Sequence, residues 1–192
     1  MVRMQGDVQE DPVSDLPPGF ESIHGPEAIA RAVDHLAAGI TARHGQRELM
    51  LVAIMDGALV FAADLLRRLP MTTRLATIRA SSYRSGRHAP GTLVVDDQLP
   101  KVRGRHVLLV DDIVDTGRTL DRIRSALLDQ EPASLEICVL LDKPSRRQIQ
   151  VPVEWIGLEI PDRFVVGYGL DDDGRHRSLP CIAAALPAAR DT

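Results

Sequence analysis

Two adjacent carboxylates, Asp111 and Asp112, follow four aliphatic residues and precede a turn of small and hydroxyl-bearing residues at 115–119. A short unbroken aliphatic run is typical of a central strand covered on both faces of a parallel sheet. Ligands of open α/β sheets bind beyond the carboxyl ends of such strands. The turn offers Gly117 for close backbone approach, and N–H groups at a helix start that favour an anion. This arrangement predicts a sugar-phosphate site whose acids suit ribose hydroxyls and Mg²⁺.

Other classes of protein place acids or phosphates at similar turns. No Gly-Lys-Ser/Thr ending follows this one, so it is not the P-loop of nucleoside triphosphatases. A response-regulator receiver carries its adjacent acids near the N-terminus, whereas about half of this chain precedes Asp111. A purely structural turn would need neither the acids nor the hydroxyls. Asp115, a carboxylate inside the phosphate turn, fits either a helix N-cap or a chemical role.

Composition limits the remaining classes. The chain has 192 residues, enough for one domain with a substantial core, and its net charge of −4 argues against a nucleic-acid partner. No apolar stretch is long enough for a membrane span, and the acidic start shows no signal peptide. Cys138 and Cys181 lie in apolar runs, which favours buried reduced thiols over a disulfide. We therefore expect a cytoplasmic protein that binds neither nucleic acid nor membrane.

Predicted helices and strands alternate along the chain, which indicates an α/β fold with a parallel sheet. Apolar residues at helical spacing mark three helices: Ile29, Val33, Leu36 and Ile40 after Pro26; Leu59, Ala62, Leu66 and Leu69; and Leu120, Ile123 and Leu127. Strands are expected at 48–55, 72–80, 107–110, 135–141 and 153–160, with short apolar segments at 164–168 and 181–186.

The domain organisation follows from the same pass along the chain. Residues 1–20 are polar and rich in Pro and Gly, which predicts a mobile N-terminal segment. Residues 21–187 are expected to form a single domain, and 188–192 a loose tail. The stretch 81–100 reads as a long loop with a short hairpin around 92–95, and loops of this length are usually functional lids or disordered.

The stretch Val107–Leu120 resembles the phosphoribosyl-pyrophosphate motif of the type I phosphoribosyltransferases, and its Asp-Ile-Val-Asp-Thr-Gly ending is similar to the hypoxanthine-guanine branch. The likeness runs from about Ile29 to Leu186. Further segments agree in the same order: Asp56-Gly57, Ser82-Tyr83, Leu140–Arg147, Ile160–Asp171 and Arg177–Pro180. The resemblance implies a Rossmann-like parallel-sheet core with helices on both faces, and a small hood built from the chain ends above the active site.

The same resemblance implies a purine salvage enzyme. It would join hypoxanthine and/or guanine to phosphoribosyl pyrophosphate, giving IMP or GMP and pyrophosphate, with Mg²⁺ as cofactor. The family forms dimers and tetramers, so a homodimer or homotetramer is expected. A regulatory protein of the same fold that senses phosphoribosyl pyrophosphate is the alternative. That class should show a DNA-binding module or a basic face, and neither is evident in the sequence.

Roles at the sugar-phosphate end are carried over by the resemblance. Asp111 and Asp112 would meet the ribose hydroxyls and, with Asp171, face Mg²⁺. Asp115 would be the general acid–base residue beside N7 of the purine. Arg177 would contact pyrophosphate through its guanidinium. The 5-phosphate would be held by Thr116, Gly117, Arg118 and Thr119.

Roles at the purine and pyrophosphate ends are implied in the same way. Lys143 would donate to the 6-oxo group, Phe164 would stack on the ring and Val165 would offer its backbone, although residue type alone favours an exposed lysine and core packing for the other two. The loop at Asp56 and Gly57 would contact pyrophosphate through backbone amides and carry a cis peptide between Met55 and Asp56. Many relatives have a basic residue at position 56, so we expect the Asp56 side chain to turn away or reach a metal-bound water. Two residues match the family's closing loop: Ser82 and Tyr83.

Overall fold

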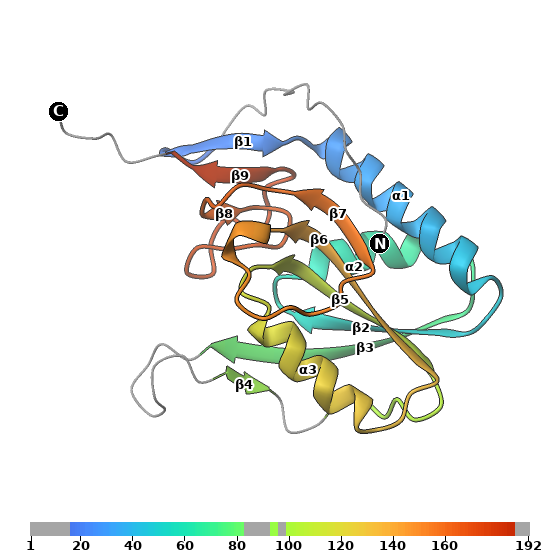
Figure 1. The fold of residues 1–192 in the computed structure, drawn as a ribbon. Helices are drawn as coiled ribbons and strands as arrows, with labels where there is room; N and C mark the ends of the chain where they lie inside the picture. The colour runs from blue at the N-terminus through green and yellow to red at the C-terminus, as the bar shows by residue number, and fades with distance from the viewer. Residues whose placement is uncertain (1–15, 83–92, 96–98, 187–192) are drawn as a thin grey trace.

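A six-stranded sheet forms the core of the computed structural model, which describes residues 16–82, 93–95 and 99–186. Five of its strands are parallel and run in the spatial order β3-β2-β5-β6-β7 (Figure 1). Their bounds are β2 (Leu49–Met55), β3 (Thr73–Ser82), β5 (His106–Val114), β6 (Ser134–Asp142) and β7 (Trp155–Glu159). The sixth strand, β4 (Leu93–Val95), pairs antiparallel with the end of β3, as the expected hairpin requires.

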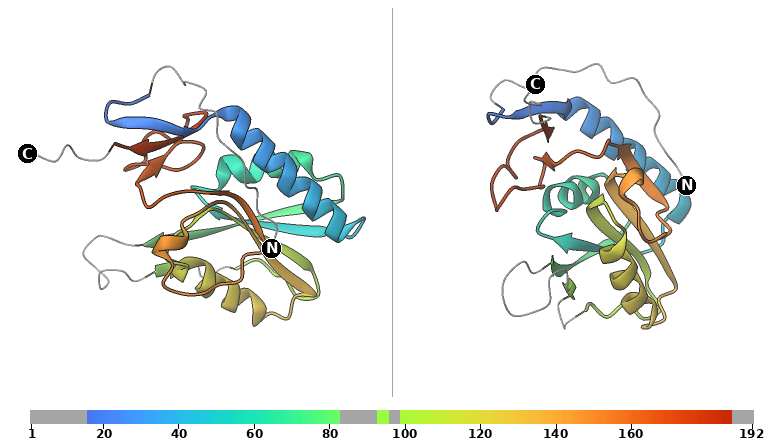
Figure 2. Two further views of the ribbon diagram at one scale, coloured as in Figure 1. Left: turned by 45° about the horizontal axis from the view of Figure 1, so that its top comes forward. Right: turned by 60° about the vertical axis from the view of Figure 1, so that its left-hand side comes forward.

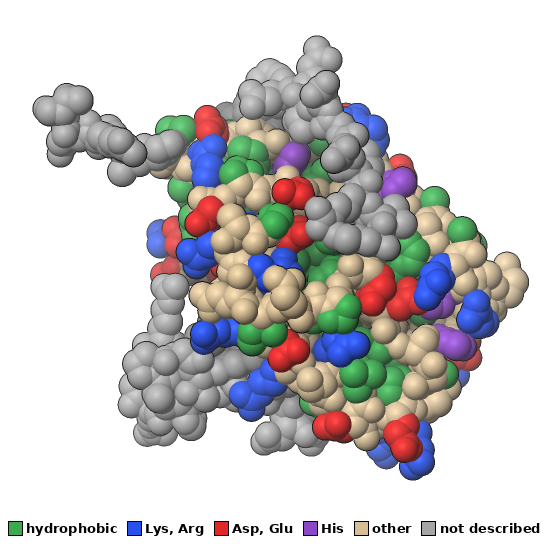
Figure 3. All heavy atoms as spheres, in the orientation of Figure 1, with side chains coloured by type: hydrophobic (Ala, Val, Ile, Leu, Met, Phe, Trp, Pro, Cys, Tyr) green, Lys and Arg blue, Asp and Glu red, His purple; other side chains and the backbone are tan. Residues whose placement is uncertain are grey.

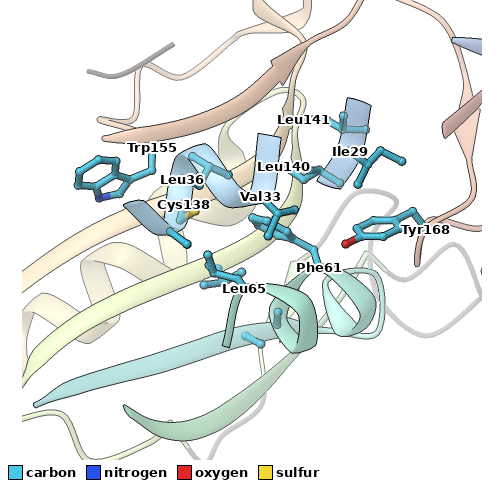
Figure 4. Packing of buried hydrophobic residues seen from close by; sticks show 14 of the residues in the cluster. Ile29, Val33, Leu36, Phe61, Leu65, Cys138, Leu140, Leu141, Trp155 and Tyr168 are labelled. Carbon is cyan, nitrogen blue, oxygen red and sulfur yellow. The ribbon is translucent and has the colours of Figure 1, made fainter. Parts of the chain in front are cut away.

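Helices cover both faces of this sheet, as predicted (Figure 2). The helices α1 (Pro26–His44) and α2 (Leu59–Arg68) lie on one face, and α3 (Arg118–Leu128) lies on the other. Side chains of β5 alternate between the two layers, because Leu108 packs with α1 and α2 whereas Leu109 packs with α3. Figure 4 shows the first of these layers. Aliphatic residues that reach both layers explain why the central strands read as unbroken apolar runs.

A second, three-stranded sheet forms the expected hood from the two ends of the described chain. Its strands are antiparallel in the order β1-β9-β8, with bounds β1 (Phe20–His24), β8 (Val165–Val166) and β9 (Ile182–Ala185). Ile182 and Ala184 join the core cluster that α1 and α2 share, so the hood is anchored by apolar packing to the main domain. A short 3₁₀ helix, η1 (Pro144–Arg146), follows β6.

Three expectations need correction. The helix α2 buries Phe61, Ala62 and Leu65, whereas Leu59 is 53% exposed. Apolar residues surround the first turns of this helix, so their spacing is compatible with either of two buried faces. The face that contains the large Phe61 side chain is the buried one, because burying it removes more apolar area from water. The strand β1 begins within the range expected to be mobile, and the motif strand β5 continues through both acids to Val114.

Most of the N-terminal segment, the C-terminal tail and most of the long loop at 81–100 lie outside the described residues. The ranges concerned are 1–15, 83–92, 96–98 and 187–192. Both cysteines are buried free thiols, as expected, and burial raises the pKa of the Cys138 thiol. None of the helices in the described part of the chain is long and apolar enough to cross a membrane. Acidic and basic side chains are interspersed over the face seen in Figure 3.

We predict that Gly39→Ala destabilises the protein, although alanine is the better helix former. A Cβ at Gly39 would lie 2.7 Å from Cζ3 of Trp155, whose ring is held by a 2.7 Å hydrogen bond from Nε1 to Oε2 of Glu136. Overpacking of this kind costs about 1–3 kcal/mol. Urea unfolding followed by the fluorescence of Trp155, the single tryptophan, measures the effect. The matched change Ala38→Gly on the exposed face should cost about 1 kcal/mol through helix propensity alone. A Gly39→Ala protein more stable than the wild type would contradict this packing argument.

Candidate active site

A cleft of about 330 Å³ lies at the carboxyl ends of the parallel strands, between the core and the hood. Three separate pieces of chain line it: the loop after β2, the end of β5 with the turn into α3, and the hood segment that carries Asp171 and Arg177. The peptide bond between Met55 and Asp56 is cis, as the resemblance implied. Most of the predicted sugar-phosphate residues therefore meet in one place: Asp56, Gly57, Asp111, Asp112, Asp115, Thr116, Gly117, Thr119, Asp171 and Arg177.

The adjacent acids Asp111 and Asp112 sit inside the end of β5 and are largely removed from water. Asp111 is only 7% exposed, and its Oδ1 accepts a 3.1 Å hydrogen bond from the backbone N–H of Asp112. The Oδ1 of Asp112 accepts a 2.8 Å bond from the N–H of Ile113. Burial raises the pKa of Asp111 well above its usual range, and the charge of Asp112 raises it further. Burial also raises the pKa of Asp112, against the opposing effects of a side-chain hydrogen bond with Asp111, of backbone bonds and of the Arg177 charge.

Two glycines let the loops close around these acids. A Cβ at Gly57 would overlap the carboxylate of Asp112, so the loop after β2 can approach the acid only without a side chain. Gly169 of the hood has φ +105°, and a Cβ there would overlap the carbonyl oxygen of Gly57. The acid, the loop and the hood are thus stacked in direct contact.

The turn into α3 presents backbone donors to the cleft. Gly117 is the N-cap with φ +85°, and no side chain caps the helix among the described residues. The N-cap role considered for Asp115 is therefore wrong. The carbonyl of Thr116 accepts 3.0 Å bonds from the N–H groups of Gln148 and Ile149, which ties the turn to the segment after η1. The N–H of Arg118, the first of α3, donates a long 3.5 Å bond to Oγ1 of Thr116, and the start of this helix favours an anion.

A group of charged residues lies beside the turn, at the end of the cleft where the purine was expected. The Nε of Arg146 donates a 3.2 Å hydrogen bond to Oδ1 of Asp115 and lies 3.8 Å from Oδ1 of Asp162. Lys143 is only 8% exposed, and burial lowers its pKa, while Asp115 and Asp162 raise it and Arg146 lowers it. Lys143 does not line the cleft, but the charge of Asp115, which does line it, acts on the Lys143 ammonium.

Sequence reasoning assigned no role to Arg146, Arg147 or Asp162. Arg147 forms a buried ion pair with Asp142, and its Nε donates a 3.2 Å bond to the backbone carbonyl of Asp115. Each of these contacts to Asp115 joins residues about thirty positions apart in the sequence. The only advance signal was that both arginines stand in the stretch that resembles the family.

The hood contributes the remaining polar contacts. Nη2 of Arg177 lies 2.9 Å from Oδ1 of Asp171, and Nη1 donates a 2.6 Å bond to the carbonyl of Gly169. The Oδ2 of Asp171 accepts a 2.6 Å bond from the N–H of Gly174. Arg177 is thus held at the roof of the cleft, where its charge reaches Asp112.

The other predicted residues stand apart from this cleft. Phe164 is 51% exposed, whereas Val165 is buried and pairs with Ala184 in the hood sheet. Arg118 is exposed at the start of α3, so its backbone faces the turn more directly than its side chain. Ser82 is described only as the last residue of β3, and Tyr83 lies outside the described residues.

The carboxylates of Asp111 and Asp112 have the chemistry of ligands for Mg²⁺. Among the described residues, no three His, Cys, Asp or Glu side chains gather closely enough to enclose a metal ion. Mg²⁺, however, is commonly bound by one or two carboxylates together with substrate oxygens and water. Asp111 and Asp112, two buried acids whose pKa values are raised, fit that mode because a divalent cation would offset the cost of ionising them.

The sheet and this cleft define an α/β protein with a polar cleft at the carboxyl edge of its parallel strands. Residues 19–173 match the phosphoribosyl transferase domain family. The hypoxanthine phosphoribosyltransferase of Haemophilus influenzae is 44% identical over 158 residues, which cover 80% of this chain and 88% of that protein. The Escherichia coli protein of the same name is 43% identical over 165 residues, which cover 84% of this chain and 93% of that protein. The chain therefore belongs to the phosphoribosyl transferase domain family.

Solved structures agree with this assignment. The hypoxanthine phosphoribosyltransferase of Trypanosoma cruzi, in complex with the product IMP, is 32% identical with a TM-score of 0.81, covering 91% of this chain and 99% of that one. These relatives are transferases, and they lend no support to the regulatory alternative.

We predict that Asp111→Asn stabilises the ligand-free protein at neutral pH. Because the folded-state pKa is raised, the protonated acid favours folding at low pH, and this contribution is lost as the pH rises through that pKa. The amide removes the charge but can still accept the bond from Asp112. The thermal midpoint should rise by about 2–4 °C near pH 8, the shift expected for about 1 kcal/mol in a chain of this size, and by less near pH 4.

Thermal denaturation at both pH values, without divalent cations, provides the measurement. Asp172→Asn, at an exposed position beside the hood loop, is the matched control and should leave the midpoint unchanged. A lower thermal midpoint for Asp111→Asn than for the wild type at pH 8 would contradict the prediction, because the ionised acid would then stabilise the fold.

Proposed function

We propose that this protein transfers the ribose 5-phosphate group of phosphoribosyl pyrophosphate to hypoxanthine and/or guanine, giving IMP or GMP and releasing pyrophosphate. The proposal rests chiefly on one arrangement: the end of β5 supplies two acids, the next turn starts a helix whose N-terminus favours an anion, and Asp115 between them acts electrostatically on the buried Lys143. A sugar, a phosphate and a polar base can be bound side by side by such a set. The activity of the named relatives supports the same conclusion.

Sugar and phosphates would bind in the described cleft. The start of α3, with Thr116, Gly117, Arg118 and Thr119, would hold the 5-phosphate through N–H groups and hydroxyls. Asp111 and Asp112 would accept hydrogen bonds from the ribose hydroxyls. The backbone at Gly57 and the guanidinium of Arg177 would hold the pyrophosphate. When the C–O bond at carbon 1 breaks, the departing pyrophosphate takes the electron pair of that bond.

The purine would bind beside Asp115. Lys143 would donate to the 6-oxo group, Phe164 would stack on the ring with its exposed face, and the Val165 backbone would meet the opposite edge. As the ring nitrogen attacks carbon 1, the purine must lose a proton, and Asp115 would be the carboxylate that accepts it. The transition state resembles an oxocarbenium ion, so positioning and exclusion of water carry much of the catalysis.

Magnesium, when bound, would neutralise and orient the pyrophosphate. We propose that Asp111 and Asp112 hold it, directly or through water, and that Asp171 approaches it from the hood. Asp171 is already paired with Arg177, so its approach requires that this pair open or that a water intervene.

At the pyrophosphate end, Asp56 is 3.9 Å from Nη2 of Arg79, and both side chains are largely exposed. We propose that Arg79 draws the Asp56 carboxylate away from the leaving group.

Ser82 and Tyr83 would belong to a closing loop, as the sequence suggests. We propose a homodimer or homotetramer on the family resemblance; Leu59 on α2 and Leu75 on β3 are each more than half exposed. The free cysteines fit a cytoplasmic location.

The function is tested by incubating the protein with phosphoribosyl pyrophosphate, Mg²⁺ and one base at a time. We expect pyrophosphate release with hypoxanthine or guanine, and a kcat/KM for adenine at least about tenfold lower. Adenine presents an amino group where Lys143 needs an acceptor, and an unmatched charged donor costs about 1.5–3 kcal/mol. Xanthine and uracil complete the panel. Absence of pyrophosphate release with every base would refute the proposal.

We predict that Asp115→Ala lowers kcat by about 10²–10⁴-fold, the usual contribution of a positioned acid–base group. Affinity for phosphoribosyl pyrophosphate should stay close to that of the wild type, because other residues hold the phosphates. Steady-state kinetics with hypoxanthine and calorimetric titration with phosphoribosyl pyrophosphate measure the two quantities. Asp129→Ala, exposed after α3, is the control. Near-normal turnover in Asp115→Ala would remove this residue from the mechanism.

A further inference from the structure

The carboxylate of Asp115 is held by an arginine that no motif assigned to the site. Arg146 is the last residue of η1, and its N–H donates a 3.1 Å bond to the carbonyl of Lys143. From there its Nε donates a 3.2 Å bond to Oδ1 of Asp115. Because η1 starts directly after Lys143, the residue expected to bind the base and the arginine that binds the acid are joined by one rigid turn.

A second arginine contacts the same residue in a different way. Arg147 is mostly buried, pairs with Asp142, and donates from Nε to the backbone carbonyl of Asp115 at 3.2 Å. Two consecutive arginines thus hold Asp115, one at its backbone and one at its side chain. The backbone contact fixes where the turn lies, and the side-chain contact fixes which way the carboxylate points.

The Arg146 contact is poorly suited to a purely structural role. Both side chains of the Arg146–Asp115 pair are 40% exposed or more. Ion pairs with this exposure add little to folding stability. The contact with Arg147, by comparison, comes from an ion pair whose side chains are no more than 11% exposed. The exposed pair therefore calls for a role other than stability.

We propose that Arg146 is a positioning residue for Asp115: it binds Oδ1 and thereby directs Oδ2 toward the purine. Within the described part of the chain, Oδ2 of Asp115 accepts no hydrogen bond, so this oxygen remains available to a substrate N–H. Asp162, whose Oδ1 lies 3.8 Å from the same Nε of Arg146, adds a second carboxylate that holds the guanidinium near this position. The charge of Arg146 also acts on Lys143, so one arginine influences both groups expected to touch the base.

This inference rests on the proposed function, and it makes a specific kinetic prediction. Arg146→Ala should lower kcat/KM for hypoxanthine by about 10–100-fold, because the acid–base group is then free to rotate away. The dissociation constant for phosphoribosyl pyrophosphate should change less than about threefold, since the phosphate contacts are untouched. Arg146→Lys keeps the charge and should recover part of the loss. The control is Arg122→Ala, an exposed position on α3 outside the site.

A double-mutant cycle with Asp115→Ala separates a positioning role from a direct one. If Arg146 acts through Asp115, adding Arg146→Ala to the Asp115→Ala protein should change kcat/KM by less than about twofold. A full 10–100-fold loss in that background would overturn the inference, because Arg146 would then act on substrate directly.

The same cycle distinguishes failure of the inference from failure of the proposed function. An active wild type with Arg146→Ala indistinguishable from Arg122→Ala would reject the positioning role alone. Thermal denaturation of each variant shows whether a loss reflects unfolding, and Arg146→Lys supplies a folded comparison if the alanine variant is unstable. A wild type inactive with every base would reject the proposed function, and the inference with it.

Discussion

Two adjacent carboxylates at the end of a central strand impose the main physical constraint on this structure. Asp111 is buried and Asp112 is partly buried; burial raises the cost of ionising each acid, and the charge of Asp112 adds to the cost at Asp111. A structure with no binding function would gain by replacing either acid. The fold instead surrounds them with backbone N–H groups and a nearby arginine, which lower the cost without removing it. The surrounding loops are arranged so that a cationic or hydroxyl-rich ligand can complete the site.

The fold was largely predictable because hydrophobic periodicity is a local property. The apolar runs in β5 and β6 are continuous over four and five residues, and α1 and α3 each present one apolar face, so their burial follows from sequence spacing. The face of α2 was not predictable in the same way, since apolar residues surround its first turns and only packing decides which are buried. The strand β1 is only five residues long and mixes apolar with polar residues, and its partner β9 lies near the other end of the chain.

The site shows the same division between local and tertiary information. Asp111, Asp112 and the turn at 115–119 are contiguous, so their convergence in one cleft could be predicted from order alone. The contacts of Arg146 and Arg147 with Asp115 depend on how the segment after β6 folds back over the turn. The resemblance drew attention to that segment but could not say which atoms meet.

The glycine contacts explain why core and hood act as one site even though the hood is a separate small sheet. The acid Asp112 touches Gly57, and Gly57 touches Gly169, each without room for a Cβ. Arg177 completes the stack, because it binds the carbonyl of Gly169 while its charge reaches Asp112. A change in the ionisation of the acids is therefore felt by the arginine in the roof, and a shift of the roof alters the surroundings of the acids. The column joins the acid at the phosphate end to the arginine of the hood through four residues: Asp112, Gly57, Gly169 and Arg177.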